Sequence, residues 1–257
     1  QVPDIDLVKM APVTGSLIRA GVPAILNPLD ANALEAAVQV KERCGGKITC
    51  VTMGPDAAAE ALRECIAAGA DRAVLLSDRA FANADTLATS YVIATAAHRL
   101  ERFDLIFCGK ESLDGATGQM GSQLAERFGS SQVTSMSLIK SLDMEKGSIV
   151  VEREVEKGVE TIEARIPCLF TVEKTNYQPR LPNYRGKKAA RTAEIITLGP
   201  GDIEGLDAKL IGVPGSGTIV PRIYPPVLPE AGQIIDEGSA AASAVKLCAM
   251  LAAEGRI

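Results

Sequence analysis

Short apolar runs alternate with stretches of helical periodicity through the first half of the chain. Short apolar runs predict buried strands, and apolar residues that recur every three or four positions predict amphipathic helices. In chain order the predicted segments are 31–43 (helix), 48–53 (strand), 56–68 (helix), 73–76 (strand), 84–100 (helix), 105–108 (strand) and 120–128 (helix). This alternation predicts an α/β fold with a mostly parallel sheet and helices on both faces.

The pattern changes in the second half of the chain. Alternating apolar and polar residues on either side of Lys157-Gly158 predict a β-hairpin, and 167–172 predicts one more strand. Residues 199–237 contain many Gly and Pro without periodicity, which indicates an extended arm, and 239–253 predicts a terminal amphipathic helix. Such a helix cannot bury its apolar face alone, so it either folds back or docks on a partner. The predicted domains are 1–195, an α/β domain, and 196–257, the arm and its helix.

The chain begins with Gln1-Val2-Pro3-Asp4, a segment typical of residues that follow directly after a strand, so we expect a strand to precede it. With that strand, a loop follows each strand of the parallel part. Sheets of this kind bind ligands at the carboxyl ends of their strands. The loops expected at that edge are 27–30, 52–55, 77–86 and 109–121.

The loop that follows the third predicted strand is rich in glycine. Gly115, Gly118 and Gly121 lie there, with Asp114 and Thr117 among them. Glycine lets a ligand approach the backbone N–H groups closely, and the following helix adds N–H donors and the positive end of its dipole. Such an arrangement suits a phosphate group. A tight strand-to-helix turn that binds no ligand would have the same glycines, and the spacing matches neither the P-loop nor the GxGxxG motif.

The composition excludes several classes of protein. A net charge of −5 argues against nonspecific nucleic-acid binding. No apolar window reaches the roughly 18 residues of a membrane span, so we expect no membrane insertion. The six cysteines form no CxxC pair, which predicts reduced thiols in a cytoplasmic protein rather than zinc or disulfide sites.

The residue types also limit the chemistry. His98 is the only histidine, so no catalytic triad and no metal cluster are expected, and we assign no catalytic residue. Aromatic residues make up only 4% of the chain, which predicts an aliphatic core. A nucleotide cofactor that carries its own chemistry fits these limits better than side-chain catalysis.

Several motifs occur in an order and spacing typical of one protein family. They are Gln1-Val2-Pro3-Asp4, Asn27 to Ala37, Val51-Thr52-Met53-Gly54-Pro55, Ala68-Gly69-Ala70-Asp71 and the loop from Asp114 to Gly121. Together they closely resemble the beta subunit of electron transfer flavoproteins. The resemblance implies a heterodimer with an alpha subunit, which is the candidate partner of the terminal helix, and a Rossmann-like fold that holds an adenine nucleotide. It assigns nucleotide contacts to Asn27, Pro28, Leu29, Asp30, Met53, Asp114, Gly115, Ala116, Thr117, Gly118, Gln119, Met120 and Gly121.

The stretch 77–90 resembles the branch of the family that performs flavin-based electron bifurcation. The resemblance implies that this subunit binds FAD, which accepts hydride from NADH. One electron then passes to ferredoxin or flavodoxin and the other, through the alpha-subunit FAD, to an acyl-CoA dehydrogenase. Beside this FAD, Arg79 could favour an anionic flavin and Thr86 or Thr89 could hydrogen-bond the ring edge, with Asp85 among the contacts.

Two alternatives remain at this stage. In the other branch the beta subunit holds a structural AMP and carries electrons from dehydrogenases, and Asp85 or Thr86 would then only cap the following helix. A nucleotide-binding adaptor without a redox role is the third hypothesis. The number of flavins bound by the complex distinguishes the three.

The basic segment 176–191 is predicted to form a polar, projecting loop, and it resembles the recognition loop with which the family docks on acyl-CoA dehydrogenases. The resemblance assigns partner contacts to Tyr184, Arg185, Lys187 and Lys188. Tyr184 stands where the family usually has Leu or Ile, and tyrosine is a good interface anchor. By composition alone, a charge run is more often only a solvated surface.

Overall fold

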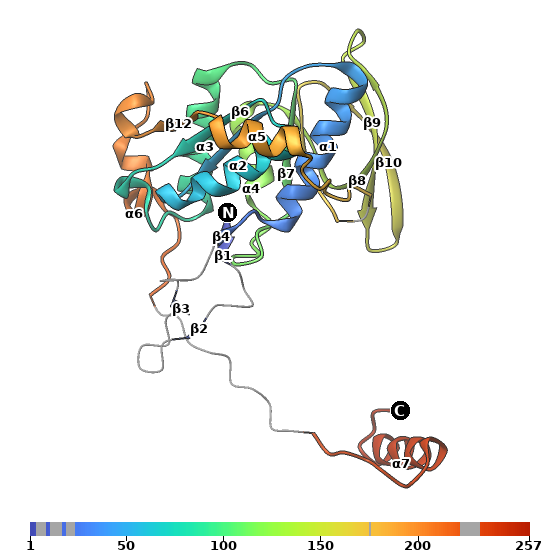
Figure 1. Ribbon diagram of the computed structural model, residues 1–257. Helices are drawn as coiled ribbons and strands as arrows, with labels where there is room; N and C mark the ends of the chain where they lie inside the picture. Colours follow the sequence, from blue (N-terminus) through green and yellow to red (C-terminus); the bar gives the residue numbers. More distant parts are fainter. Residues whose placement is uncertain (4–8, 11–16, 19–23, 175, 222–231) are drawn as a thin grey trace.

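The computed structural model describes residues 1–3, 9–10, 17–18, 24–174, 176–221 and 232–257. Within them the chain forms an α/β body followed by a C-terminal segment with one helix (Figure 1). The body contains a three-stranded and a five-stranded sheet, together with two-stranded antiparallel pairs. The pairs join β1 (Val2–Pro3) to β4 (Ala24–Ile25) and β2 (Lys9–Met10) to β3 (Leu17–Ile18).

The three-stranded sheet is parallel throughout, with the order β12–β6–β5. Its strands are β5 (Thr49–Met53), β6 (Arg72–Leu76) and β12 (Ile195–Leu198). In β6, Ala73 and Leu75 pack into one apolar core, and Val74 and Leu76 pack into another. Successive side chains of a strand point to opposite faces, so the sheet is covered on both sides, as the sequence predicts.

The five-stranded sheet has the order β10–β9–β8–β11–β7 and is mixed. β11 runs parallel to β7 and to the first part of β8, whereas β8, β9 and β10 are antiparallel to one another. The predicted hairpin and the predicted strand near 167–172 are confirmed. The strands are β7 (Leu105–Gly109), β8 (Ser131–Asp143), β9 (Ser148–Val155), β10 (Gly158–Arg165) and β11 (Cys168–Val172).

The long strand β8 was not predicted. Its pairing shifts register against both neighbours, between Phe170 and Val172 of β11 and at two places against β9. Ser135, inside the strand, has a positive φ of 56°. Each irregularity breaks the period-two alternation of apolar residues by which a strand is recognised in a sequence.

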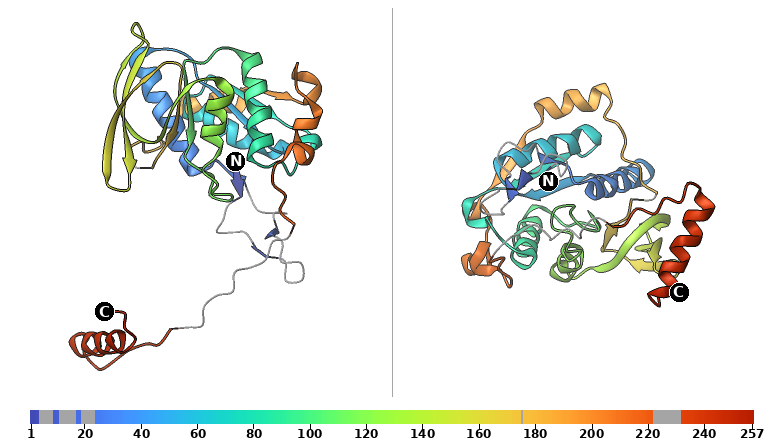
Figure 2. Two further views of the ribbon diagram at one scale, coloured as in Figure 1. Left: turned by 180° about the vertical axis from the view of Figure 1, so that it is seen from behind. Right: turned by 90° about the horizontal axis from the view of Figure 1, so that it is seen from below.

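Helices cover both faces of the sheets (Figure 2). α1, α2 and α5 lie on one side, where α1 packs on β11 and α2 on β6, and α3 and α4 lie on the other. The predicted α/β fold is confirmed, with helix ends within a few residues of the predicted ones. The helices are α1 (Pro28–Cys44), η2 (Asp56–Ala58), α2 (Ala59–Ala68), η3 (Arg79–Phe81), α3 (Thr86–Leu100) and α4 (Met120–Phe128).

The segment predicted as a projecting polar loop differs in the structure, because its second half is the helix α5 (Tyr184–Thr192). Asn183 caps it by accepting a hydrogen bond from Gly186 N at 2.8 Å. α5 lies on α2, and a Cβ at Gly186 would collide with the carbonyl oxygen of Ala67. Small residues make this contact, so the helix has no apolar stripe that the sequence could reveal.

The predicted arm also differs in its first part. Residues 199–218 pack on the body through η4 (Pro200–Asp202), η5 (Ala208–Leu210) and α6 (Gly212–Gly215). Ile203 and Ile211 are buried there, against α3 and β6. Single apolar anchors separated by turns carry no periodicity, which is why the packing is invisible in the sequence.

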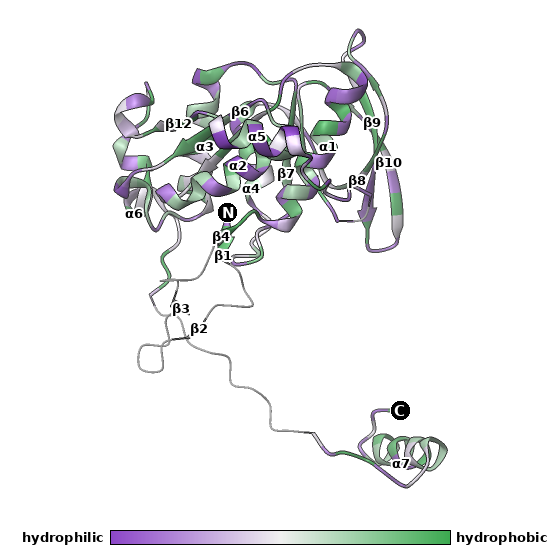
Figure 3. Ribbon diagram, in the orientation of Figure 1, coloured by the Kyte–Doolittle hydropathy of each residue, from purple (hydrophilic) through white to green (hydrophobic). Residues whose placement is uncertain are grey.

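The predicted terminal helix is present as α7 (Ala240–Ala253). Its residues are apolar except for Ser243 and Lys246, and most of the helix has the green of hydrophobic residues in Figure 3. None of its residues is buried, and Val245 is 72% exposed. Among the described residues, no helix combines the length and apolar character needed to cross a membrane.

Candidate functional site

The carboxyl ends of β5 and β7, Met53 and Gly109, line the same cavity. Gly54, directly after β5, lies beside the side chain of Gln1. Val2 pairs with Ile25, two residues before Asn27. The loop after β5 and the segment that leads into α1 therefore both lie close to the first residues of the chain.

Asn27 and Asp30 attach the start of α1 to the loop after β7. The Asn27 side chain donates to Asp30 Oδ2 at 2.8 Å and to the Glu111 carbonyl at 2.9 Å, and it accepts from Leu113 N at 3.2 Å. Gly109 N donates to Asp30 Oδ1 at 2.7 Å. Asn27 is only 1% exposed. These two predicted residues thus act in the structure by holding one loop against another.

The loop between β7 and α4 is shaped by left-handed backbone conformations. Ala116 has φ 46° and Gly118 has φ 60°, and Ala116 N donates to Ser112 O at 2.8 Å. α4 begins without a side-chain cap, so its first N–H groups are not bound by a capping side chain. They can donate to an anionic group, with the helix dipole in support.

Gly121 has a packing role that the sequence did not show. A Cβ at this position would collide with the Cγ2 atom of Thr171 in β11. The glycine therefore lets α4 approach the sheet closely. Its place among the ligand contacts stays a prediction.

The start of α3 is joined to the start of α4. Thr86 Oγ1 donates to Gln119 Oε1 at 2.9 Å and accepts from Gln123 Nε2 at 3.2 Å. Gln123 Oε1 is buried without a hydrogen-bond partner among the described residues, so it can accept from a ligand donor. Gln123 was missed in the sequence, where its only signal is its place one helical turn after Gln119.

Asp85 caps α3, as one of the alternatives predicted. Its carboxylate accepts from Ala88 N at 3.0 Å and from both the backbone and the hydroxyl of Thr218. Burial would raise the pKa of Asp85, but these hydrogen bonds outweigh it and lower the pKa. The carboxylate is thereby occupied in joining α3 to the segment after α6. Arg79 is exposed on η3.

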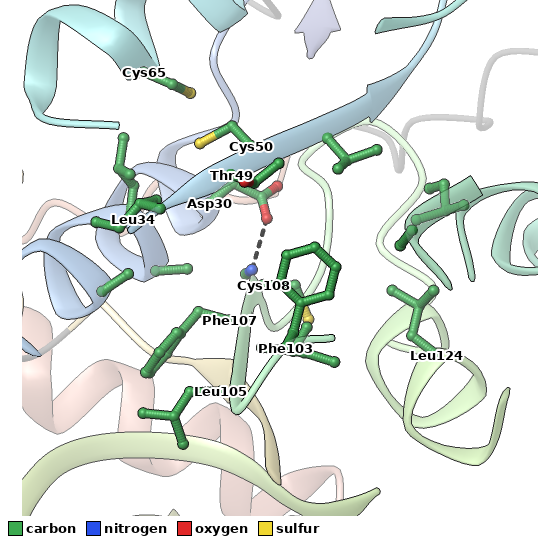
Figure 4. A pocket seen from close by; sticks show the side chains of 18 of the residues that line it. Asp30, Leu34, Thr49, Cys50, Cys65, Phe103, Leu105, Phe107, Cys108 and Leu124 are labelled. Carbon is green, nitrogen blue, oxygen red and sulfur yellow. Dashed lines mark hydrogen bonds between the residues drawn. The ribbon is translucent and has the colours of Figure 1, made fainter. Parts of the chain in front are cut away.

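A cavity of about 750 Å³ lies between β5 and β7 (Figure 4). It brings together some predicted residues but not others, and most of its lining is apolar. The predicted residues in the lining are Asp30, Met53, Thr89, Thr117, Gly118, Gln119 and Met120. The predicted residues outside it are Asn27, Pro28, Leu29, Arg79, Asp85, Thr86, Asp114, Gly115, Ala116 and Gly121.

The predicted partner residues are all accessible. Tyr184 is 83% exposed, and Arg185, Lys187 and Lys188 are exposed on the same helix. The segment before them is tied to α1, because the Arg180 guanidinium donates to Glu35 at 2.8 and 2.9 Å and also pairs with Glu42. Burial would raise the pKa of Glu35, but Arg180 outweighs burial and holds that pKa below its ordinary value.

Arg180→Ala is expected to lower the free energy of unfolding by about 2–3 kcal/mol, because it leaves the nearly buried Glu35 carboxylate without its cation. The pKa of Glu35 is lower in the folded state, so the pair stabilises fully above the unfolded pKa of about 4.3 and loses this effect as the pH falls through the folded pKa. Urea unfolding should therefore show a difference that shrinks below about pH 4. Arg185→Ala removes an exposed arginine nearby and is the control. A difference that does not vary with pH would contradict the role of Glu35.

Comparison with known proteins identifies a family. Residues 14–202 match the electron transfer flavoprotein domain. Protein FixA of Bradyrhizobium diazoefficiens is 41% identical over 95% of this chain and 87% of its own length. The electron transfer flavoprotein subunit beta of Thermoanaerobacterium thermosaccharolyticum is 43% identical over 91% of this chain and 88% of its own. Subunit CarD of the caffeyl-CoA reductase–Etf complex of Acetobacterium woodii is 44% identical, with the same shares covered.

Proposed function

This chain belongs to the electron transfer flavoprotein family as a beta subunit, and on that premise we propose that it holds an FAD and takes part in electron bifurcation. NADH is the donor. Electrons leave to a ferredoxin or flavodoxin and, through the flavin of an alpha subunit, to an acyl-CoA dehydrogenase. The relatives named FixA and CarD support this branch, and CarD is itself named as part of a complex that acts on an acyl-CoA.

The proposal rests on the contact between the N-terminal ends of α3 and α4. Thr86, within the 77–90 stretch, donates a hydrogen bond to Gln119, in the loop that we propose holds the phosphates. A nucleotide whose phosphates rest on residues 117–120 thus has its remaining length within reach of 77–90. An FAD needs such a second contact region, whereas an AMP ends near its phosphate.

The residues present fit a flavin nucleotide. In this proposal the N–H groups around the left-handed Gly118 and at the uncapped start of α4 would hold the diphosphate. Asn27 and Asp30 fix the position of that loop. Gln123 Oε1 offers an acceptor, and the half-buried Thr89 adds a hydroxyl in the cavity lining. When bound, FAD supplies the hydride and single-electron chemistry, and the protein binds and orients it.

The flavin count of the complex tests the proposal. The chain is co-purified with its alpha subunit, the nucleotides are released with acid, and FAD and AMP are quantified by chromatography. Two FAD per heterodimer are expected. One FAD with one AMP would instead support the electron carrier with a structural AMP, and a complex without flavin would support the adaptor hypothesis.

Tyr184→Ala is expected to weaken binding of the acyl-CoA dehydrogenase about 30-fold, since a central interface tyrosine contributes about 2 kcal/mol. The dissociation rate should rise, and the flavin content should stay unchanged. Stopped-flow electron transfer at low partner concentration measures the effect. Electron transfer at the wild-type rate would mean that α5 is a solvated surface and not the docking site.

Lys187→Glu combined with Lys188→Glu tests the charge of the same helix. The association rate with the dehydrogenase should fall, and the defect should shrink as salt screens the charges. Lys157→Glu with Arg165→Glu makes the same charge change on the β9–β10 hairpin and is the matched control. Equal defects in the two double variants would show that only net charge matters.

A further inference from the structure

A segment that follows β12 lies along α3 (Figure 2). This segment, residues 203–218, is called the strap below. At the C-terminal end of α3, the Arg99 side chain donates to the Glu204 carbonyl at 3.0 Å. Nearer the other end of the helix, Asp207 N donates to the Tyr91 hydroxyl at 2.9 Å. The strap therefore follows α3 towards its N-terminal end, where the proposed flavin contacts begin.

Apolar contacts hold the strap on the body. Ile203 and Ile211 are buried in the same core as Phe81 of η3. Gly212 has φ 56°, and a Cβ at this position would collide with the carbonyl oxygen of Ala80. Glycine thus allows the strap to approach the backbone of η3 closely. The strap is in this way fixed against both η3 and α3.

Asp85 joins the end of the strap to the start of α3. Its Oδ1 atom accepts from Ala88 N at 3.0 Å, which is the capping hydrogen bond of the helix. Its Oδ2 atom accepts from the backbone N–H and from the hydroxyl of Thr218, at 2.9 and 3.0 Å. Asp85 N donates to Ser216 Oγ at 2.9 Å. A cap needs only one side-chain oxygen, so the second oxygen of Asp85 serves the strap.

The helix start that is held in this way carries both threonines of the proposed flavin contact. Thr86 follows Asp85 directly, and its hydroxyl donates to Gln119 Oε1 at 2.9 Å. Thr89 N donates to the Asp85 carbonyl at 3.0 Å, within the first turn of the helix. The position of Asp85 therefore sets where the two threonine hydroxyls lie.

We propose that Asp85 is a positioning residue for the flavin half of the bound FAD, and that Ser216 and Thr218 of the strap hold it in place. This inference rests on the proposed function, in which FAD reaches the start of α3. Asp85 acts through Thr86 and Thr89 and does not touch the ring, because its carboxylate is already hydrogen-bonded on both oxygens. The strap fixes the N-terminal end of α3 so that the two hydroxyls face the ring edge.

The strap then contributes to the choice between nucleotides. In the proposed function the phosphates rest on residues 117–120, and both FAD and AMP have a phosphate to place there. Only FAD has a flavin half that reaches the 77–90 stretch. Specificity is a difference between two affinities. Loosening the strap should therefore weaken the binding of FAD and leave the binding of AMP nearly unchanged.

Competition between the two nucleotides tests this role. The heterodimer is equilibrated with equal concentrations of FAD and AMP, free nucleotide is removed, and bound nucleotide is released with acid and quantified. FAD in excess of one per heterodimer belongs to the beta-subunit site. Asp85→Asn keeps an oxygen for the cap, since Asn is also a good N-cap, but places an amide N–H2 group against the donors of Thr218. The ratio of FAD to AMP in this site should fall about fivefold or more, because hydrogen bonds to a charged group are lost.

Matched variants separate positioning from a general loss of stability. Thr218→Val removes the hydroxyl donor with little change of shape and should lower the ratio about twofold or more. Thr218→Ser keeps the donor and should give the wild-type ratio. Asp207→Asn removes the same charge from the strap, at the residue whose side chain accepts from Lys209 N, and should also give the wild-type ratio.

The outcomes distinguish this inference from the proposal on which it rests. A wild-type heterodimer that binds AMP but no second FAD would overturn both. A second FAD in the wild type, together with an unchanged ratio in Asp85→Asn, would overturn the positioning role alone. An equal fall in Asp207→Asn, or an equal loss of FAD and AMP in Asp85→Asn, would also overturn that role, because the strap would then support the fold and not the flavin.

Discussion

Gly118→Val is expected to reduce the bound nucleotide at least tenfold. Gly118 has φ 60°, and a Cβ there would meet only Glu111 Oε2, at 4.0 Å. A valine side chain therefore meets little of the protein itself and instead enters the space through which a phosphate approaches the N–H groups. The measurement is the nucleotide released with acid from the purified heterodimer.

A matched control separates this effect from backbone strain. Gly129, at the end of α4, has φ 59°, and a Cβ there meets nothing within 4 Å. Valine at either position is strained by about 1–2 kcal/mol, but Gly129 is outside the predicted site. Gly129→Val should retain the nucleotide with a similar loss of stability. Equal amounts of bound nucleotide in the two variants would contradict the assignment of Gly118 to the phosphate site.

Removing residues 238–257 is expected to prevent stable heterodimer formation. α7 is apolar on nearly every side, and none of its residues is buried. A helix of this kind is stable only when its surface is covered. Burying one leucine contributes about 1.5–3 kcal/mol, so loss of the helix costs many orders of magnitude in affinity. Size-exclusion chromatography of the mixed subunits measures this.

Point substitutions make the same test without truncation. Leu247→Asp should weaken the heterodimer at least tenfold, because it places a charge in the contact. Lys246→Asp, at the only charged position of α7, is expected to change little, because charged side chains are rare in the buried core of an interface. If Lys246→Asp weakened the heterodimer and Leu247→Asp did not, a different face of α7 would contact the alpha subunit.

Local patterns were sufficient for most secondary structure. The apolar runs and helical periodicity of residues 31–128 predicted each α-helix and strand there within a few residues, because each forms from a continuous segment with one buried face. The short 3-10 helix η3 was predicted as part of a loop. Capping of α3 by Asp85 was one of the predicted alternatives, because capping is a local interaction that the sequence can reveal. By contrast, β8 and α5 were missed, since bulges hide the alternation of β8 and small residues make the contact of α5 with α2.

The candidate site could be predicted only in part. The glycines after β7 and the residues 27–30 are visible as motifs, and the resemblance to a family names them. Their actual contacts, such as Asn27 with Glu111 and Leu113, join positions more than eighty residues apart. No local pattern encodes such a pairing.

The sequence by itself determined the α/β fold, the apolar terminal helix and the positions that carry the family's motifs, because these depend on the order of residues along the chain. The tertiary structure alone decided that Asp85 binds the 216–218 segment, that Gly121 serves packing against Thr171, and that the large cavity follows two edge strands. These features arise where separate segments meet, and the free energy of such contacts depends on distances in space that the linear sequence does not contain.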